Sequence, residues 1–268
     1  MYSLRSGLIF FLVFSFSCQE QKTDIKETDS DTTALIEKTV LHDETLTNKS
    51  DLGIIISKFT EGGAPPLIID TAFIHKSQTK DTLTAKQLKL LTAKMLDHSL
   101  TSMSNWELEK FYQIDSIKVA GKYNEYCSSL DLGMMKYSNV YPMRQIKLDE
   151  KTTVLIWELQ YGSYEACPHS EGMVVYATII YLGKPTHSLL LAEYMTAADP
   201  PVSTQRTVIA TILEGGKIEI NVVEINDEGV DIEKVEEVKE NYMFQVLEGI
   251  PHLLNEKKMQ PRMVKRKS

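Results

Sequence analysis

The sequence predicts an α+β protein, an antiparallel β-meander of six to eight strands with a helical pair near its start. Two helix-start signals lie early in the folded part, and the apolar period changes from helical to alternating at about residue 117. The strand-like runs that follow are joined by short connections, which favour antiparallel neighbours. A closed β-barrel is the alternative, because a meander of about eight strands can close around a cavity.

The first elements precede this change of period. A β-branched run at residues 53–57 predicts an early strand, and a second apolar run at residues 67–69 follows a breaker rich in Gly and Pro. Thr84 and Gln87 form a capping box that predicts a helix through about Ser99. Ser104 and Glu107 form a second box, which predicts a short helix. The apolar residues of both helices recur at helical spacing, which is typical of a core face.

The predicted strands begin with an alternation at residues 130–134 and a run that reaches Tyr161. Residues 174–181 and 189–195 are apolar on both faces, as strands covered on both sides are. The clearest signal is a hairpin, in which alternating runs at 208–213 and 218–222 flank Gly215-Gly216. A last strand near residues 242–247 precedes a turn at Glu248-Gly249.

Asp199-Pro200-Pro201 follows one of these strands. Two prolines cannot donate to a sheet ladder, so a chain reversal that ends the pairing is predicted. A rigid recognition loop is the alternative.

The amino terminus carries an export signal. Arg5 precedes an apolar run at residues 7–16, and Ser17-Cys18 follows. Residues 1–17 resemble a bacterial lipoprotein signal peptide. Ser15-Phe16-Ser17-Cys18 stand at the four positions of its lipobox, where Ser17 and Cys18 fit the pattern. The resemblance implies a lipid such as palmitate on Cys18. It also implies localisation at the outer membrane, because the residue after the cysteine is Gln19. Plain secretion after cleavage, or an uncleaved anchor, are the alternatives.

Charge and composition divide the remainder. Residues 18–51 are acidic and poor in apolar side chains, so a disordered tether is predicted. Residues 52–256 form a single α+β domain. After Glu256 all charges are basic, and residues 257–268 are expected to be a disordered tail, with contact to an anionic lipid or glycan surface as the alternative. The net charge of −8 disfavours nucleic acid as a partner.

The chain has three cysteines. If Cys18 carries the lipid, Cys127 and Cys167 remain as an even pair in a compartment where disulfides persist. A Cys127–Cys167 disulfide is therefore predicted, and two buried thiols are the alternative.

Motifs for phosphate loops, zinc helices, nucleophile elbows and calcium loops are not found in the sequence, and no cofactor or metal is expected. The one dense polar cluster is the turn at residues 164–172. A hairpin loop tied down by the disulfide is the main interpretation. One alternative is a metal site of Cys167 and His169 with Glu165 or His187. The other is a Cys167 nucleophile with His169 as its base.

Together these features predict a non-catalytic lipoprotein of the cell envelope, lipid-anchored and facing the periplasm or the exterior. It would bind an unknown protein or glycan partner or serve in assembly. A carrier with a barrel cavity for a small apolar ligand is the second hypothesis. An enzyme centred on Cys167, His169 and Glu165 is the third.

Overall fold

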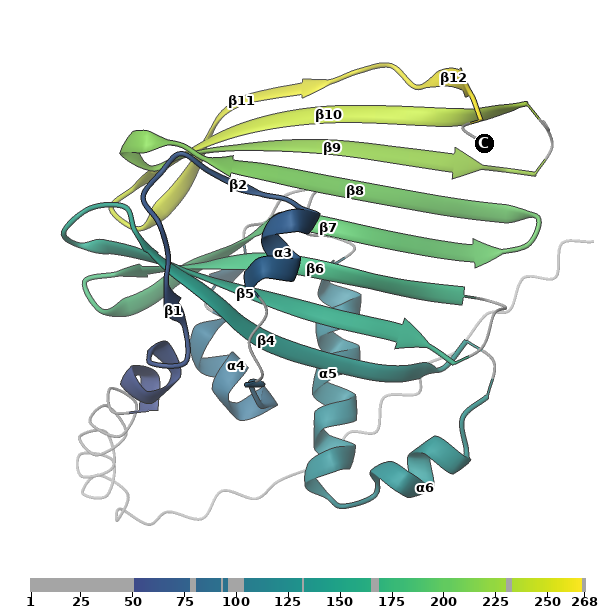
Figure 1. The fold of residues 1–268 in the computed structure, drawn as a ribbon, viewed down its shortest axis with the longest axis horizontal. Coiled ribbons are helices and arrows are strands. Elements are labelled where there is room, and N and C mark those ends of the chain that lie inside the picture. The colour runs from purple at the N-terminus through teal and green to yellow at the C-terminus, as the bar shows by residue number, and fades with distance from the viewer. Residues whose placement is uncertain are drawn as a thin grey trace, which may run out of the picture. The chain divides into compact units, whose positions relative to one another are not determined.

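The computed structural model describes residues 51–77, 81–92, 94–95, 104–131, 133–164, 169–229 and 233–266 (Figure 1). The signal peptide, Cys18, the acidic tether and Cys167 lie outside these ranges. The described residues belong to one compact unit. Their fold is α+β, with helices concentrated before the main run of strands, as the sequence predicts.

The centre of the fold is a meander of eight strands, each antiparallel to the next (Figure 1). It consists of β4 (Met135–Lys147), β5 (Thr152–Ser163), β6 (His169–Tyr181), β7 (Lys184–Asp199), β8 (Val202–Ile212), β9 (Lys217–Asp227), β10 (Lys234–Leu247) and β11 (Ile250–Lys258). The predicted strand count is confirmed at its upper limit.

The three predicted turns between strands are confirmed, and Glu248 and Gly249 join β10 to β11. Gly215 and Gly216 have φ of 70° and 75° in the short 3-10 turn η1 (Glu214–Gly216), and they join β8 to β9 as a hairpin. Asp199 pairs with Val202 across the two prolines, so this segment is the chain reversal between β7 and β8.

The sheet forks between β7 and β8. These strands pair only where Glu193–Asp199 faces Val202–Val208. Beyond that point β8 pairs with β2 (Leu67–Ile69), whereas β7 pairs in parallel with β3 (Lys94–Met95). The two short strands therefore supply hydrogen-bond partners for edges that the fork would otherwise leave open.

The closed barrel is wrong. Closure requires the first and last strands of the meander to pair with each other. The outer edge of β4 instead pairs in parallel with β1 (Thr60–Glu61), and further along Val140 bridges Leu83. The strand order runs from β1 and β4 to β11 without returning, so the sheet is open.

The helices differ in part from their predicted bounds. The capping box of Thr84 and Gln87 is confirmed, but α4 (Ala85–Leu91) is shorter than predicted, because Met95 belongs to β3. α5 (Ser104–Val119) begins where predicted and is longer, and α6 (Tyr123–Ser128) follows it. α3 (Thr71–Ser77) follows β2. Within the ranges described here, no helix is both long and apolar enough to cross a membrane.

Two predicted strands are not strands. Residues 51–56 are helical, because Leu52, Ile55 and Phe59 are the buried positions and their spacing of three and four follows a helix. The alternation at residues 130–134 precedes β4, which begins at Met135, and Gly133 and Met134 form a turn.

The basic carboxyl-terminal segment is part of the sheet up to Lys265, not a disordered tail. Lys257 and Lys258 end β11, and β12 (Arg262–Lys265) pairs with the start of β10. Arg262 Nη2 lies 2.6 Å from Glu237 Oε2, and Arg266 Nη1 lies 2.7 Å from Asp227 Oδ2. Acidic residues on the neighbouring strands thus offset the basic charges of this segment.

The core fills both faces of the central strands. Every residue from Val174 to Ile180 is buried, which confirms the prediction that this run is covered on both sides. Trp157 and Tyr176 stack with their ring centroids 4.5 Å apart, and the indole Nε1 donates to Thr178 Oγ1 at 2.9 Å. α5 packs against β4 and β5 on one face of the sheet, where Trp106 meets the ring of Tyr161 edge-on.

Candidate functional site

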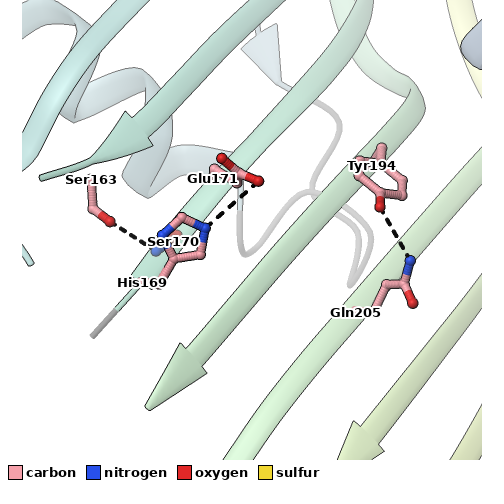
Figure 2. Close-up of polar contacts among 6 residues, drawn as sticks. All are labelled: Ser163, His169, Ser170, Glu171, Tyr194 and Gln205. Atoms are coloured by element: carbon pink, nitrogen blue, oxygen red, sulfur yellow. Dashed lines mark hydrogen bonds and ion pairs between the residues drawn. The ribbon is translucent and has the colours of Figure 1, made fainter. Parts of the chain in front are cut away.

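The polar turn singled out in the sequence joins β5 to β6. Its residues 165–168, including Glu165 and Cys167, lie outside the described part of the chain. On one side of this gap the Tyr164 N–H donates to Met134 O at 2.7 Å, and on the other His169 begins β6. Ser170 N donates to Ser163 Oγ at 2.9 Å, which ties the ends of the two strands together (Figure 2).

Among the described residues, Glu171 is the acidic neighbour of His169. His169 Nε2 lies 3.6 Å from Glu171 Oε1 (Figure 2). His187 lies eleven residues from Ala198, the strand partner of His169, so roughly 35 Å of extended chain separates it from His169. His187 lies beside the turn at Gly249, and its Nδ1 is 3.3 Å from the Gly249 carbonyl oxygen. His187 is therefore no partner for His169 in a metal site, and the described residues hold no group of three metal-ligating side chains.

The register places His169 and Glu171 on a larger polar surface. Residues directly opposite each other on neighbouring strands share a face of the sheet. One row runs from Tyr137 on β4 through Gly162, Glu171 and Thr196 to Gln205 on β8. The next row contains Asn139 on β4, then Gln160, Met173, Tyr194 and Thr207. We call these two rows together with His169 the polar face.

The side chains of the polar face are half-buried or exposed, and they are held by each other. Gln205 Nε2 donates to the Tyr194 hydroxyl at 3.4 Å, and both side chains project from the sheet on the same side as His169 and Glu171 (Figure 2). Gln160 Nε2 donates to Glu158 Oε1 at 2.9 Å. The surface thus offers amide, hydroxyl, imidazole and carboxylate groups on rigid strands.

Tyr137 lies across the gap left by Gly162. A Cβ at position 162 would stand 2.7 Å from a carbon of the Tyr137 ring, so the glycine makes room for that ring. The side chain of Tyr137 remains 37% exposed. Burial and the nearby Glu171 carboxylate raise the pKa of Tyr137, so its hydroxyl stays protonated and able to donate.

The opposite face of the same strands carries a buried ionisable cluster. Tyr161, adjacent to Gly162 on β5, points toward α5 and lies close to Glu107. Glu193 of β7 and Arg206 of β8 lie on this face too, with Arg206 Nε 3.4 Å from Glu193 Oε2. Glu107 is 5% exposed and Tyr161 is 1% exposed. Neither Glu107 Oε2 nor the Tyr161 hydroxyl has a hydrogen-bond partner of standard length and angle in the described structure.

Burial dominates the acidity of this cluster. It raises the pKa of Glu107 to about 7, and the negative charge of Glu193 acts in the same direction. Burial also raises the pKa of Glu193, although the guanidinium of Arg206 opposes the shift. A carboxyl with a pKa near 7 has the acidity that general acid–base catalysis requires. Because this carboxyl lies on the buried side of α5, against Tyr161 and Glu193 of the sheet, its protonation acts on the packing of that helix.

Sequence reasoning identified His169, with Cys167 and Glu165, and Glu171 entered only as part of the turn at residues 164–172. It missed Tyr137, Tyr194 and Gln205, because register cannot be read from a single run of residues. It also interpreted Glu107 as part of a capping box. The signal for burial was present in Leu108 and Phe111, which flank Glu107 on the apolar side of α5.

Of the two cysteines in the predicted disulfide, only Cys127 lies in the described part of the chain. Cys127 is exposed in α6, whereas Cys167 and the lipidation residue Cys18 fall outside the described ranges. The predicted Cys127–Cys167 disulfide therefore remains a prediction.

Comparison with models of known protein families, with curated proteins and with solved structures found no match to this chain.

Proposed function

We propose that the protein is a non-catalytic binding module of the bacterial cell envelope, held at the outer membrane by a lipid on Cys18. The polar face carries this proposal. It consists of half-buried or exposed polar and aromatic side chains on five adjacent strands. Exposed polar groups on a rigid scaffold are suited to recognition.

The support for the envelope comes from the sequence. The apolar run at residues 7–16 and Ser17-Cys18 have the features of an export and lipidation signal, and the acidic segment after Cys18 would separate the domain from the membrane.

The other two hypotheses have less support. A carrier was expected to enclose its ligand in a barrel, and the sheet is open. An enzyme at Cys167 needs a base and a third polar partner. Of the residues suggested for it only His169 is described, and its neighbour Glu171 is an exposed carboxylate on the polar face.

Anchoring is tested by metabolic labelling with palmitate, followed by membrane fractionation. The wild-type chain should carry the label and sediment with outer membranes, whereas Cys18→Ser should lose both properties. Cys127→Ser is the matched control and should retain them. Equal labelling of wild type and Cys18→Ser would refute the lipid anchor.

Binding is tested with envelope fragments stripped of lipid. The mature Cys18→Ser chain should co-sediment with them, and Gln205→Arg on the polar face should abolish this. Lys122→Glu lies in the exposed connection between α5 and α6 and serves as the control. Failure of the unmodified polar face to retain any fragment would refute a binding role in the envelope.

A further inference from the structure

We infer that the polar face is a binding site for an uncharged glycan chain. This inference rests on the proposed binding function and names the chemistry of its ligand. The site consists of Tyr137, Gln160, Glu171, Tyr194, Thr196 and Gln205, with Thr207 and His169 at its margins.

The shape of the site fits an extended ligand. Neighbouring strands lie about 4.8 Å apart, so a row from β4 to β8 spans roughly 19 Å. The second row runs parallel to the first, two residues along each strand, which is a separation of roughly 7 Å. A shallow strip of these dimensions accommodates a chain laid across the strands rather than a compact molecule in a deep pocket.

The functional groups fit a ligand rich in hydroxyl groups. The amides of Gln160 and Gln205 both donate and accept, as do the hydroxyls of Thr196 and Tyr194. Sugar hydroxyls also both donate and accept. Tyr137 and Tyr194 add aromatic rings whose apolar faces can pack on the C–H groups of a sugar ring, while their hydroxyls remain available for hydrogen bonds.

The charge of the site argues against an anionic ligand. Among the described residues of these two rows on β4–β8, none is Lys or Arg, and Glu171 adds a carboxylate. Phosphate, sulfate and carboxylate groups are bound by Arg and Lys. Lys118 of α5 reaches only the β4 margin, where its Nζ donates to Asn139 Oδ1 at 2.9 Å. A neutral glycan therefore complements this surface better than a nucleic acid or a phosphorylated lipid, which would require several cationic contacts.

The composition of the site argues against a protein partner. The centre of a protein–protein interface is apolar and contains buried anchor side chains. In these rows Met173 is the one aliphatic side chain beside the two tyrosines, and it is partly buried against the core of this domain. The rows therefore offer little of the aliphatic surface that the centre of a protein–protein interface contains.

The site is also ordered before any ligand binds. Gln205 and Tyr194 contact each other across β7 and β8 (Figure 2). The Tyr137 ring lies over Gly162. Side chains held in this way lose less conformational freedom on binding than mobile ones.

Affinity electrophoresis of the mature Cys18→Ser chain tests the inference. The gels contain dextran, mannan or galactan as neutral probes, or dextran sulfate as an anionic probe. At least one neutral polysaccharide should retard the protein, and dextran sulfate should not. Tyr194→Ala and Gln205→Ala should each weaken retardation about tenfold. Gln113→Ala replaces an exposed glutamine of α5 and should leave it unchanged. Thermal melting of each variant establishes that it is folded.

The envelope-fragment assay separates this inference from the proposed function. If fragments retain the protein and protease treatment of the fragments abolishes retention, the partner is a protein; the binding function then stands and the glycan inference is overturned. Retention that survives protease and is lost on digestion of the glycan supports it. Retardation by dextran sulfate alone would also overturn it.

Discussion

The ring of Tyr161 occupies the space that a side chain at position 172 would need. A Cβ built on Gly172 lies 2.7 Å from the Tyr161 hydroxyl oxygen, and the tyrosine is almost completely buried beneath α5. One strand away on the other face, Tyr137 covers Gly162 at a similar distance. Each glycine thus admits a tyrosine from the preceding strand, and the two tyrosines point to opposite faces of the sheet.

The two glycines should respond differently to the same substitution. Gly172→Ala should destabilise the protein by about 1–3 kcal/mol, because the buried Tyr161 ring has no room to move away. Gly162→Ala should cost less, because the partly exposed Tyr137 can swing toward solvent. Urea unfolding of both variants measures the difference. Equal losses would mean that burial of the tyrosine does not decide the cost.

The buried carboxyl of Glu107 should make stability depend on pH. Its pKa is about 7 in the folded protein and 4.5 when unperturbed, so the folded state holds its proton more tightly than the unfolded state. The resulting stability is fully present below pH 4.5 and is lost as the pH rises through 7. A shift of this size corresponds to about 3 kcal/mol. Urea unfolding at pH 5 and pH 8 should show the decrease.

Glu107→Gln isolates this effect, because glutamine does not titrate. The variant should lose most of the decrease between pH 5 and pH 8, with the remainder due to Glu193, whose pKa is also raised by burial. Glu109→Gln is an exposed control on the same helix and should behave as the wild type. The same slope in wild type and Glu107→Gln would contradict the assignment.

The ion pair of Arg206 and Glu193 should be costly to break from one side. Arg206→Met leaves the Glu193 carboxylate buried without its guanidinium, and the expected loss is about 3–5 kcal/mol at neutral pH. The double variant Glu193→Gln with Arg206→Met should recover part of that loss, since no uncompensated charge remains. A double-mutant cycle by chemical denaturation gives the coupling. Strict additivity of the two changes would show that the residues are not coupled.

The strands of this fold were predictable because their pattern is local. The run at 208–222 alternates around Gly215-Gly216 and needs no tertiary information, and the continuous apolar run from Val174 indicates a strand covered on both faces. The helix at residues 51–56 was not predicted, because three consecutive isoleucines favour a strand by propensity. Burial of Leu52, Ile55 and Phe59 against the rest of the domain overrides that preference.

The candidate site was less predictable because it depends on register. His169 was identified from the sequence and Glu171 lies in the same polar turn, but Tyr194 and Gln205 join them only through the pairing of β6, β7 and β8. A shift of one residue in any of these pairings would turn a side chain to the other face. The polarity of each residue is visible in the sequence, whereas the face that it occupies is not.

The predicted disulfide between Cys127 and Cys167 involves a residue of α6. Cys127 lies in α6, which is fastened to the start of β4 by hydrogen bonds from Tyr123 and Tyr126 to Lys136 O and Met135 O. Tyr164, three residues before Cys167, pairs with Met134 at the same end of the sheet. Cys127 and Tyr164 therefore both belong to segments held near the start of β4, and Cys167 follows Tyr164 by three residues in the sequence.

A bridge between Cys127 and Cys167 would close a loop of about 40 residues and stabilise the domain by roughly 4 kcal/mol in the chain-entropy description. We expect the oxidised Cys18→Ser chain, alkylated under denaturing conditions without reductant, to show no modified cysteine by intact mass. Cys127→Ser should then show one modified cysteine, at position 167. Two modified cysteines in the parent chain would exclude the disulfide. They would also leave Cys167 as a free thiol two residues before His169 in the sequence, and the enzyme hypothesis would then regain support.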